Sequence, residues 1–150
     1  MDTGEIDLAT PVEKAIRLLS TLNLDVYDVC AAYSRALRIG LLGKGIKEAS
    51  SRTDLGIGVR AYRNRGLGVA FSQSLEPADL ETTVHQAVGF ARVAQPDPYF
   101  KGIPGPSKAL EVPDLCDAEI SGLTLGEAGG FARRMIDAVE DVRRLSLIHI

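Results

Sequence analysis

The chain has 150 residues, of which 45% are hydrophobic and 25% charged, as is typical of a globular protein with one ordinary domain or one small domain and part of a second. Its net charge of −3 offers no basic surface that would favour nucleic acid, and no apolar stretch is long enough to span a membrane. Because Met1–Asp7 lacks the features of an export signal, and Cys30 and Cys116 have neither metal-type nor redox-type spacing, we expect a cytoplasmic protein.

The first predicted element is a helix that begins at Thr10 and ends near Asn23. Thr10 can cap this helix, Pro11 suits its first turn, and Glu13 completes a capping box. Apolar residues then recur at helical spacing, and these are Val12, Ala15, Ile16, Leu19 and Leu22. This spacing predicts that one side of the helix faces a hydrophobic core.

From Val26 onward the hydrophobic period changes to two, which is typical of β-strands. Two segments place alternating apolar residues on one face, first Tyr27, Val29, Ala31 and Tyr33, and then Leu37, Ile39 and Leu41. Gly43-Lys44 fits a two-residue hairpin loop with glycine first. The more polar segment Ile46–Thr53 predicts a strand at a sheet edge, or one with both faces partly wet.

A second hairpin is predicted to join residues 56–62 to residues 66–72. A three-residue loop at 63–65 would place six apolar residues on one face, which is the register that burial favours. The facing pairs would be Ile57 with Phe71, Val59 with Val69, and Ala61 with Leu67. A two-residue loop would scatter these residues over both faces, so the pattern favours the longer loop. The opposite face would be nearly bare, and it would carry Gly56, Gly58, Arg60, Gly68, Ala70 and Ser72.

Pro77 begins a second predicted helix that ends at Ala94, with an inner face formed by Leu80, Val84, Ala87, Val88 and Ala91. Five of the seven prolines lie between Pro96 and Pro113, which predicts an extended connector. Beyond it, a capping box from Thr124 to Glu127 begins a third predicted helix. Its predicted apolar stripe consists of Ala128, Phe131, Met135, Ala138 and Val142.

These elements predict an α+β domain over residues 1–95, with a five-stranded, mostly antiparallel sheet packed against two helices. Residues 96–120 form the predicted proline-rich connector. Residues 121–150 are expected to be the start of a truncated central domain, because so short a segment cannot bury a core of its own.

The order of these segments resembles the N-terminal domain of the TldD/PmbA family. The passages that carry the resemblance are Glu48–Arg60, Gly66-x-Gly68 followed by Ala70-Phe71-Ser72, Phe90-Ala91-Arg92, Pro96-Asp97-Pro98-Tyr99 and Pro113-Asp114-Leu115. The two proline-containing passages resemble the family's entry into its central domain. The similarity extends from about Asp25 to about Arg143 and favours the PmbA-like branch.

The resemblance implies a relation to zinc metallopeptidases, whose helical His-Glu-x-x-x-His motif binds the metal and activates water. This sequence has no such motif, and its histidines are His85 and His149. We therefore expect a fragment with no catalytic residue, no metal ligand and no cofactor, while zinc would belong to the full-length parent or its partner. The last residues, Leu145–Ile150, depart from the family pattern and resemble translated adapter sequence, so we assign no role to His149.

Isolated reactive side chains are expected to be structural. His85 has no second ligand beside it in its predicted helix, and Cys30 has no base partner in its strand. Both Gly-x-Gly pairs lie inside strands, whereas a dinucleotide-binding fingerprint needs a glycine turn before a helix. The acidic residues Asp114, Asp117 and Glu119 fit a solvated connector better than acid–base catalysis.

The candidate site is the sparsely covered hairpin face at Gly56, Gly58, Arg60 and Gly68, because glycine within a strand allows another backbone to approach closely. One hypothesis places a helix, a neighbouring domain or a partner subunit there, with Arg60 as the polar contact. The alternative is a face covered by the domain's own helices.

Two functions follow from the sequence. The leading hypothesis is a non-catalytic N-terminal part of a TldD/PmbA-like metallopeptidase or of its partner subunit. By resemblance, such a part would help to enclose a peptide-processing cavity and would pair with a homologous subunit in a homo- or heterodimer. The alternative is a stand-alone binding or scaffold module with no connection to proteolysis.

Overall fold

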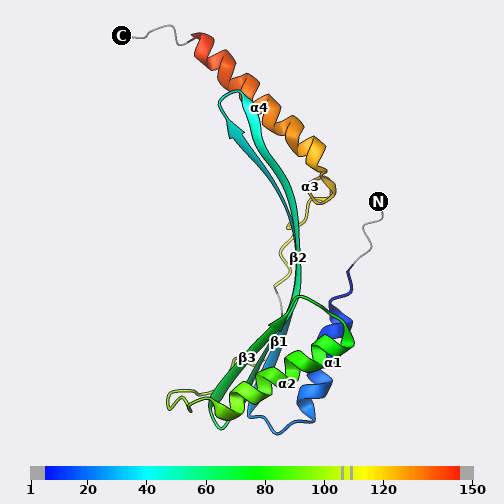
Figure 1. Ribbon diagram of the computed structural model, residues 1–150, viewed down its shortest axis with the longest axis vertical. Helices are drawn as coiled ribbons and strands as arrows, with labels where there is room; N and C mark the ends of the chain where they lie inside the picture. The colour runs from blue at the N-terminus through cyan, green and yellow to red at the C-terminus, as the bar shows by residue number, and fades with distance from the viewer. Residues whose placement is uncertain (1–5, 106, 109, 146–150) are drawn as a thin grey trace. The chain divides into compact units, whose positions relative to one another are not determined.

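The computed structural model describes residues 6–105, 107–108 and 110–145 (Figure 1). It divides into two compact units, of which the first comprises Met1–Ser34 and Asp54–Ser107 and the second Arg35–Thr53 and Lys108–Ile150. Apart from Leu145, the tail that was predicted to depart from the family lies outside the described residues. The predicted domain boundaries at residues 95 and 120 stay predictions.

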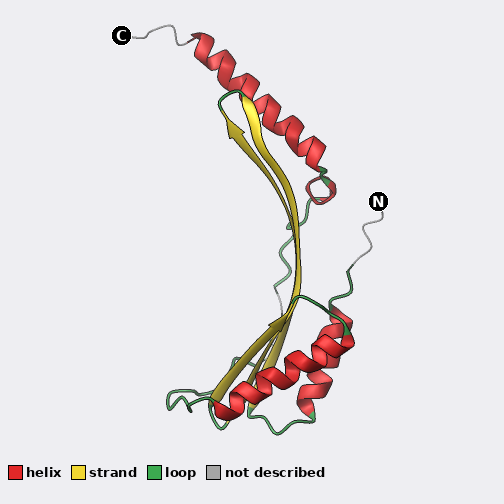
Figure 2. Ribbon diagram, viewed as in Figure 1, coloured by secondary structure: helices red, strands yellow, loops and turns green. Residues whose placement is uncertain are grey.

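The α+β class is confirmed, but the sheet has three strands and not five (Figure 2). The strands are β1 (Val26–Leu42), β2 (Gly45–Arg63) and β3 (Gly66–Ser72), in the order β1-β2-β3. Two predicted strands merge into β1 and two into β2. The reason is visible in the sequence of β1, since no glycine or proline turn separates its two segments and the apolar residues keep to odd-numbered positions on both sides of Arg35.

In the first unit, helix α1 (Ala9–Ser20) begins earlier than predicted and is capped by a different residue. The backbone N–H of Thr10 donates to Asp7 Oδ1 at 3.0 Å, so Thr10 lies inside the first turn. Hydrogen bonds from Thr10 lower the pKa of the Asp7 carboxyl below its ordinary value. Ala15 and Leu19 are fully buried.

Helix α2 (Pro77–Val93) matches its prediction closely. All five residues of the predicted inner face are buried, together with Thr83, whose hydroxyl donates to the Asp79 carbonyl at 2.7 Å. Both helices lie on the same face of the sheet (Figure 1). The core between them and the sheet consists of Ala15, Leu19, Ile57, Val59, Ala61, Ala70, Leu80, Val84, Ala87, Val88 and Ala91.

The second unit contains the hairpin formed by the far ends of β1 and β2, with the predicted Gly43-Lys44 loop confirmed and Gly43 at a φ of 59°. Two helices accompany it, α3 (Ala118–Gly122) and α4 (Leu125–Leu145). Arg35 on β1 donates through Nη2 to the carbonyls of Ser121 at 3.2 Å and Leu123 at 2.6 Å, which satisfies acceptors at the end of α3.

The capping box of α4 is confirmed, because Thr124 N donates to Glu127 Oε2 at 2.8 Å and Glu127 N donates to Thr124 Oγ1 at 3.2 Å. The predicted apolar stripe is wrong in its orientation. Phe131 and Met135 are exposed, whereas the next residue in each case, Ala132 and Ile136, is buried. A Cβ added to Gly129 would lie 3.8 Å from Ile46 Cδ1, so α4 faces the hairpin through a stripe rotated by about 100° from the predicted one.

Candidate binding surface of the three-stranded sheet

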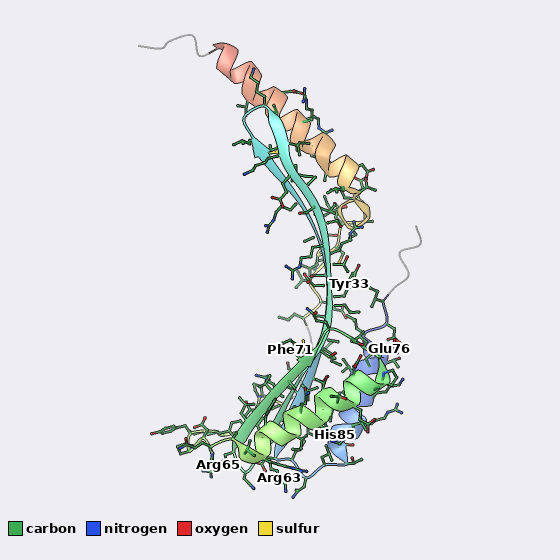
Figure 3. All side chains as sticks on the ribbon, viewed as in Figure 1. Tyr33, Arg63, Arg65, Phe71, Glu76 and His85 are labelled. Atoms are coloured by element: carbon green, nitrogen blue, oxygen red, sulfur yellow. The ribbon has the colours of Figure 1, made fainter. Side chains whose placement is uncertain are left out.

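The register of the second hairpin differs from the predicted one. Only Asn64 and Arg65 form the loop, and their φ angles of 50° and 66° are those of a two-residue type I′ turn. Figure 3 labels Arg63 and Arg65 at this end of the hairpin. The facing pairs include Val59 with Ala70, Arg60 with Val69, and Ala61 with Gly68. Consequently Val59 and Val69 point to opposite faces of the sheet, and the predicted single apolar face is wrong.

Close packing by α2 explains this register. A Cβ added to Gly68 would overlap the Ala87 carbonyl oxygen and the Ala91 amide nitrogen. A Cβ added to Gly66 would lie 2.6 Å from the Ala91 carbonyl oxygen, which is also too close for a real side chain. The nearly bare face of β3 is therefore the one that the chain's own helix covers, and its apolar face points away from the core.

The four residues proposed as one interface are consequently separated. Gly68 lies under α2, whereas Gly56, Gly58 and Arg60 occupy the alternate positions of β2 that face away from the helices. A Cβ at Gly58 would meet nothing closer than the Cys30 carbonyl oxygen at 3.9 Å. A Cβ at Gly56 would lie 2.9 Å from the Ser72 carbonyl oxygen, so that position is locally crowded by β3.

Arg60 forms an ion pair that the sequence did not reveal. Its Nε and Nη2 donate to the two carboxylate oxygens of Asp28 on β1, at 2.9 Å and 2.5 Å. These hydrogen bonds raise the pKa of Arg60 above its ordinary value. Asp28 alternates with the core-facing residues Tyr27 and Val29, and this parity is the signal that could have placed it beside Arg60.

We call the side of the sheet away from the helices the open face. It carries three exposed apolar side chains of β3, namely Leu67 at 43%, Val69 at 48% and Phe71 at 79% relative exposure. The remaining positions belong to β1 and β2, and they are Asp28, Cys30, Gly56, Gly58, Arg60 and Tyr62. An open face with this apolar content differs from the polar outer face that an exposed antiparallel sheet normally presents.

One end of the open face is covered by the residues that follow α2. The Phe100 ring stacks on Tyr62 with a centroid distance of 4.1 Å and an angle of 10° between the ring planes. Asp97 N donates to the Arg65 carbonyl at 3.0 Å, which ties the same segment to the hairpin loop. The beginning of the predicted connector is thus part of the first unit. No local sequence pattern predicts its contacts with Tyr62 and Arg65.

The other side chains that the sequence singled out, a histidine, two cysteines and an aspartate, lie apart from one another or take part in local structure. His85 lies on the outer surface of α2 with its side chain 61% exposed, and its Nε2 is 3.8 Å from Glu81 Oε1 one turn away (Figure 3). Cys30 and Cys116 are exposed free thiols. Asp117 caps α3, since its Oδ1 accepts from Glu119 N at 2.8 Å and from Ile120 N at 3.2 Å.

Zinc binding can be tested against the donor set. Within residues 6–105, 107–108 and 110–145, no group of three or more His, Cys, Asp or Glu side chains is placed to hold a metal ion. A protein zinc site needs three or four such ligands around one point. The described residues therefore do not fit a zinc site, and no catalytic step through zinc follows from them.

Comparison with known proteins finds a family match that includes residues of both units. Residues 27–91 match the family described as PmbA/TldA metallopeptidase domain 1. The structure is similar to the crystal structure of TldE from Thermococcus kodakarensis, with a TM-score of 0.68 and 24% sequence identity. The match covers 77% of this chain and 26% of the TldE chain, so the chain spans about a quarter of that protein. No curated protein matches the sequence. Among the described helices, none has both the length and the apolar character that a membrane crossing requires.

Proposed function

We propose that this chain, whose residues 27–91 match the first domain of the PmbA/TldD family, is a non-catalytic N-terminal part of a TldD/PmbA-like metallopeptidase or of its partner subunit. In that role it would help to enclose a peptide-processing cavity and would take part in oligomerisation. The peptide substrate would belong to the assembled protein, and zinc would be held by the remainder of the parent or by its partner.

One observation carries this proposal. The family match runs from Tyr27 on β1 to Ala91 on α2, and it therefore includes all of β2 and β3 and nearly all of the helix that covers them. Two polar side chains in this region have structural partners, since Arg60 pairs with Asp28 and Thr83 donates to the Asp79 carbonyl. Such a region supports a wall or an interface better than a reaction centre.

The open face favours a second candidate function, a stand-alone binding or scaffold module. Leu67, Val69 and Phe71 are exposed together there beside the Arg60–Asp28 ion pair. Exposed apolar groups with polar neighbours mark surfaces that bind other proteins. This function would require no peptidase at all.

A domain exchange distinguishes the two functions. Residues 27–91 would replace the structurally equivalent segment of the Thermococcus kodakarensis TldE, and the chimera would be compared with TldE for folding, oligomeric state and peptide hydrolysis in its assembly. We expect the chimera to fold and to keep each property. A chimera that also carries Gly68→Leu is the control, and it should fail to fold because α2 can no longer reach β3. A folded chimera that loses assembly and hydrolysis would favour the stand-alone module.

A further inference from the structure

Within the part of the chain that the structure describes, strand β3 has a neighbouring strand on one side only. Among the described residues β3 pairs only with β2, because the sheet order is β1-β2-β3. Natural proteins protect such edges with charged residues or proline. The opposite edge strand, β1, contains Asp28, Arg35 and Arg38, whereas β3 contains no charged residue and no proline. The free edge of β3 therefore has neither charged residues nor proline to oppose pairing with another strand.

The hairpin loop determines which backbone groups point outward. A two-residue turn makes Arg63 and Gly66 a hydrogen-bonded pair, and hydrogen-bonded and non-hydrogen-bonded pairs then alternate along the strands. Leu67 consequently faces Tyr62 in a non-hydrogen-bonded pair. An independent contact agrees, since the Tyr62 carbonyl accepts from Asp25 N at 2.8 Å on the side away from β3.

The same alternation applies to every second residue of β3. The backbone N–H and C=O groups of Leu67, Val69 and Phe71 point to the free edge, while those of Gly68 and Ala70 pair with β2. The outward-pointing groups thus belong to the three residues whose side chains are exposed on the open face. A strand added at this edge would gain backbone hydrogen bonds and apolar neighbours from the same three residues.

Helix α2 supplies a further apolar group near this edge. A shallow depression between α1 and α2 is lined by Glu81, which places Glu81 on the side of α2 that faces α1. Phe90 follows nine residues later, and at about 100° per residue it lies half a turn away from Glu81. Phe90 is 52% exposed on that side, away from α1. Because α2 packs directly on β3, this side of the helix borders the free edge.

We propose that β3 pairs edge to edge with β3 of a second copy of this chain, in an antiparallel arrangement about a two-fold axis at Val69. Leu67 of each copy would then face Phe71 of the other, and Val69 would face Val69. This register uses the outward N–H and C=O groups of all three residues and joins two three-stranded sheets into one. It deepens the oligomerisation named in the proposed function, on which it rests, by assigning the partner and the strand that makes the contact.

A second copy is the occupant that these features favour. Like charges that face each other across a strand pair destabilise it, and a neutral strand avoids this penalty when it pairs with itself. Apolar side chains would meet apolar side chains at each position on the open face. A two-fold axis also makes the contact closed, so that it stops at a dimer instead of continuing into a fibre.

The test combines sedimentation velocity with amide hydrogen exchange on the intact chain over a wide range of concentration. We expect a reversible dimer in which the amides of Leu67, Val69 and Phe71 become protected as the dimer forms. The amides of Gly68 and Ala70 should be protected at every concentration, because they pair with β2. Val69→Lys places two positive charges at the two-fold axis and should weaken dimerisation at least tenfold.

Two further variants keep the result interpretable. Ala32→Lys adds the same charge to the open face on β1, the strand farthest from the free edge of β3, and should leave the dimer unchanged. Val69→Pro removes an outward-pointing N–H and keeps every hydrogen bond to β2. It should also weaken the dimer, and it replaces the lysine variant if that variant fails to fold. A monomer at every concentration, a dimer whose three outward amides still exchange rapidly, or a Val69→Lys chain that dimerises normally would overturn the proposal. Protection of these amides in a monomer would overturn it too, by showing that another part of the chain covers the edge.

Discussion

At Gly68 the lack of a side chain allows the backbone of α2 to lie directly on β3. The atoms that a Cβ would strike belong to the helix backbone at Ala87 and Ala91, so no side-chain rotation can relieve the overlap. Gly58, on the open face, has ample space for a Cβ. The two glycines look alike in sequence, each in a Gly-x-Gly pair, yet only one of them determines the position of a helix.

The first prediction compares these two glycines. Gly68→Ala should lower the free energy of unfolding by about 3 kcal/mol, because the helix must move away from the sheet to accommodate the methyl group. Gly58→Ala should change it by less than about 0.5 kcal/mol, as a surface substitution with no clash does. Urea unfolding followed by circular dichroism measures both. Equal effects would show that α2 does not rest on Gly68.

A second residue-scale prediction concerns Glu127 in the capping box of α4. Hydrogen bonds from Thr124 lower the pKa of the Glu127 carboxyl. Because the folded pKa lies below the unfolded one, this contact stabilises the start of α4 above the unfolded pKa and is lost as the pH falls through the folded pKa. In Thr124→Val, which lacks the hydroxyl donor, the pKa should rise toward its ordinary value. Carboxyl NMR titration measures the pKa, and an unchanged value in the variant would contradict the capping contact.

At the scale of the element, the register of β2 against β3 decides which valine is in the core. Val59 is 0% exposed and Val69 is 48% exposed, although the sequence pattern assigned both to one apolar face. Val59→Ala should cost about 2 kcal/mol through the lost burial and the cavity left behind. Val69→Ala should cost less than about 0.5 kcal/mol. Urea unfolding of both variants, at a concentration where the chain is monomeric, measures the difference. Equal losses of unfolding free energy would favour the three-residue loop that the sequence predicted.

Helix α4 offers the same comparison on neighbouring residues. Ile136 is 6% exposed and Met135 is 63% exposed, whereas the predicted stripe contained Met135 and not Ile136. Ile136→Ala should destabilise the protein by about 3 kcal/mol, within the usual range for a buried aliphatic truncation. Met135→Ala should have little effect. Hydrogen exchange at the amides of α4 follows both, and faster exchange in the methionine variant alone would favour the originally predicted face.

The elements that sequence reasoning predicted correctly are those with local causes. Helix α2 was identified with its five inner residues because Pro77 begins it and the apolar spacing suits one face. The capping box at Thr124 and the glycine-first loop at Gly43 also depend on neighbouring residues alone. The strand count was wrong because a change in polarity was taken for a break, although no turn residue was present.

At the scale of the whole molecule, β1 and β2 each contribute residues to both compact units. The family match lies across these same two strands and ends on α2. The order of segments along the chain therefore indicated the resemblance that the family match supports, even though the register, the strand count and the orientation of α4 were predicted incorrectly. A comparison based on segment order and glycine positions is unaffected by these errors, because it does not depend on which face of a strand is buried.

The interface expected at Gly56, Gly58, Arg60 and Gly68 stays a prediction, and the structure divides these four residues between two faces of the sheet. Arg60 and Gly58 do lie on one face, as the alternation of β2 requires, with Arg60 paired to Asp28 and open space above Gly58. Gly68 was placed with them because the loop was taken to be one residue longer than it is. Asp28 was missed because its partner lies on another strand, and the three apolar residues of the open face were assigned to the core.

The sequence by itself determined the local features of this protein: two-residue periodicity in the strands, the start and the inner face of α2, the capping box of α4, and the order of segments on which the family resemblance rests. Tertiary structure alone decided which side of β3 is buried. Burial of apolar side chains within an isolated hairpin favours one register, but a helix backbone that must lie against the sheet requires Gly66 and Gly68 beneath it. That requirement turns Leu67, Val69 and Phe71 outward, toward the face and the edge where a second strand can bind.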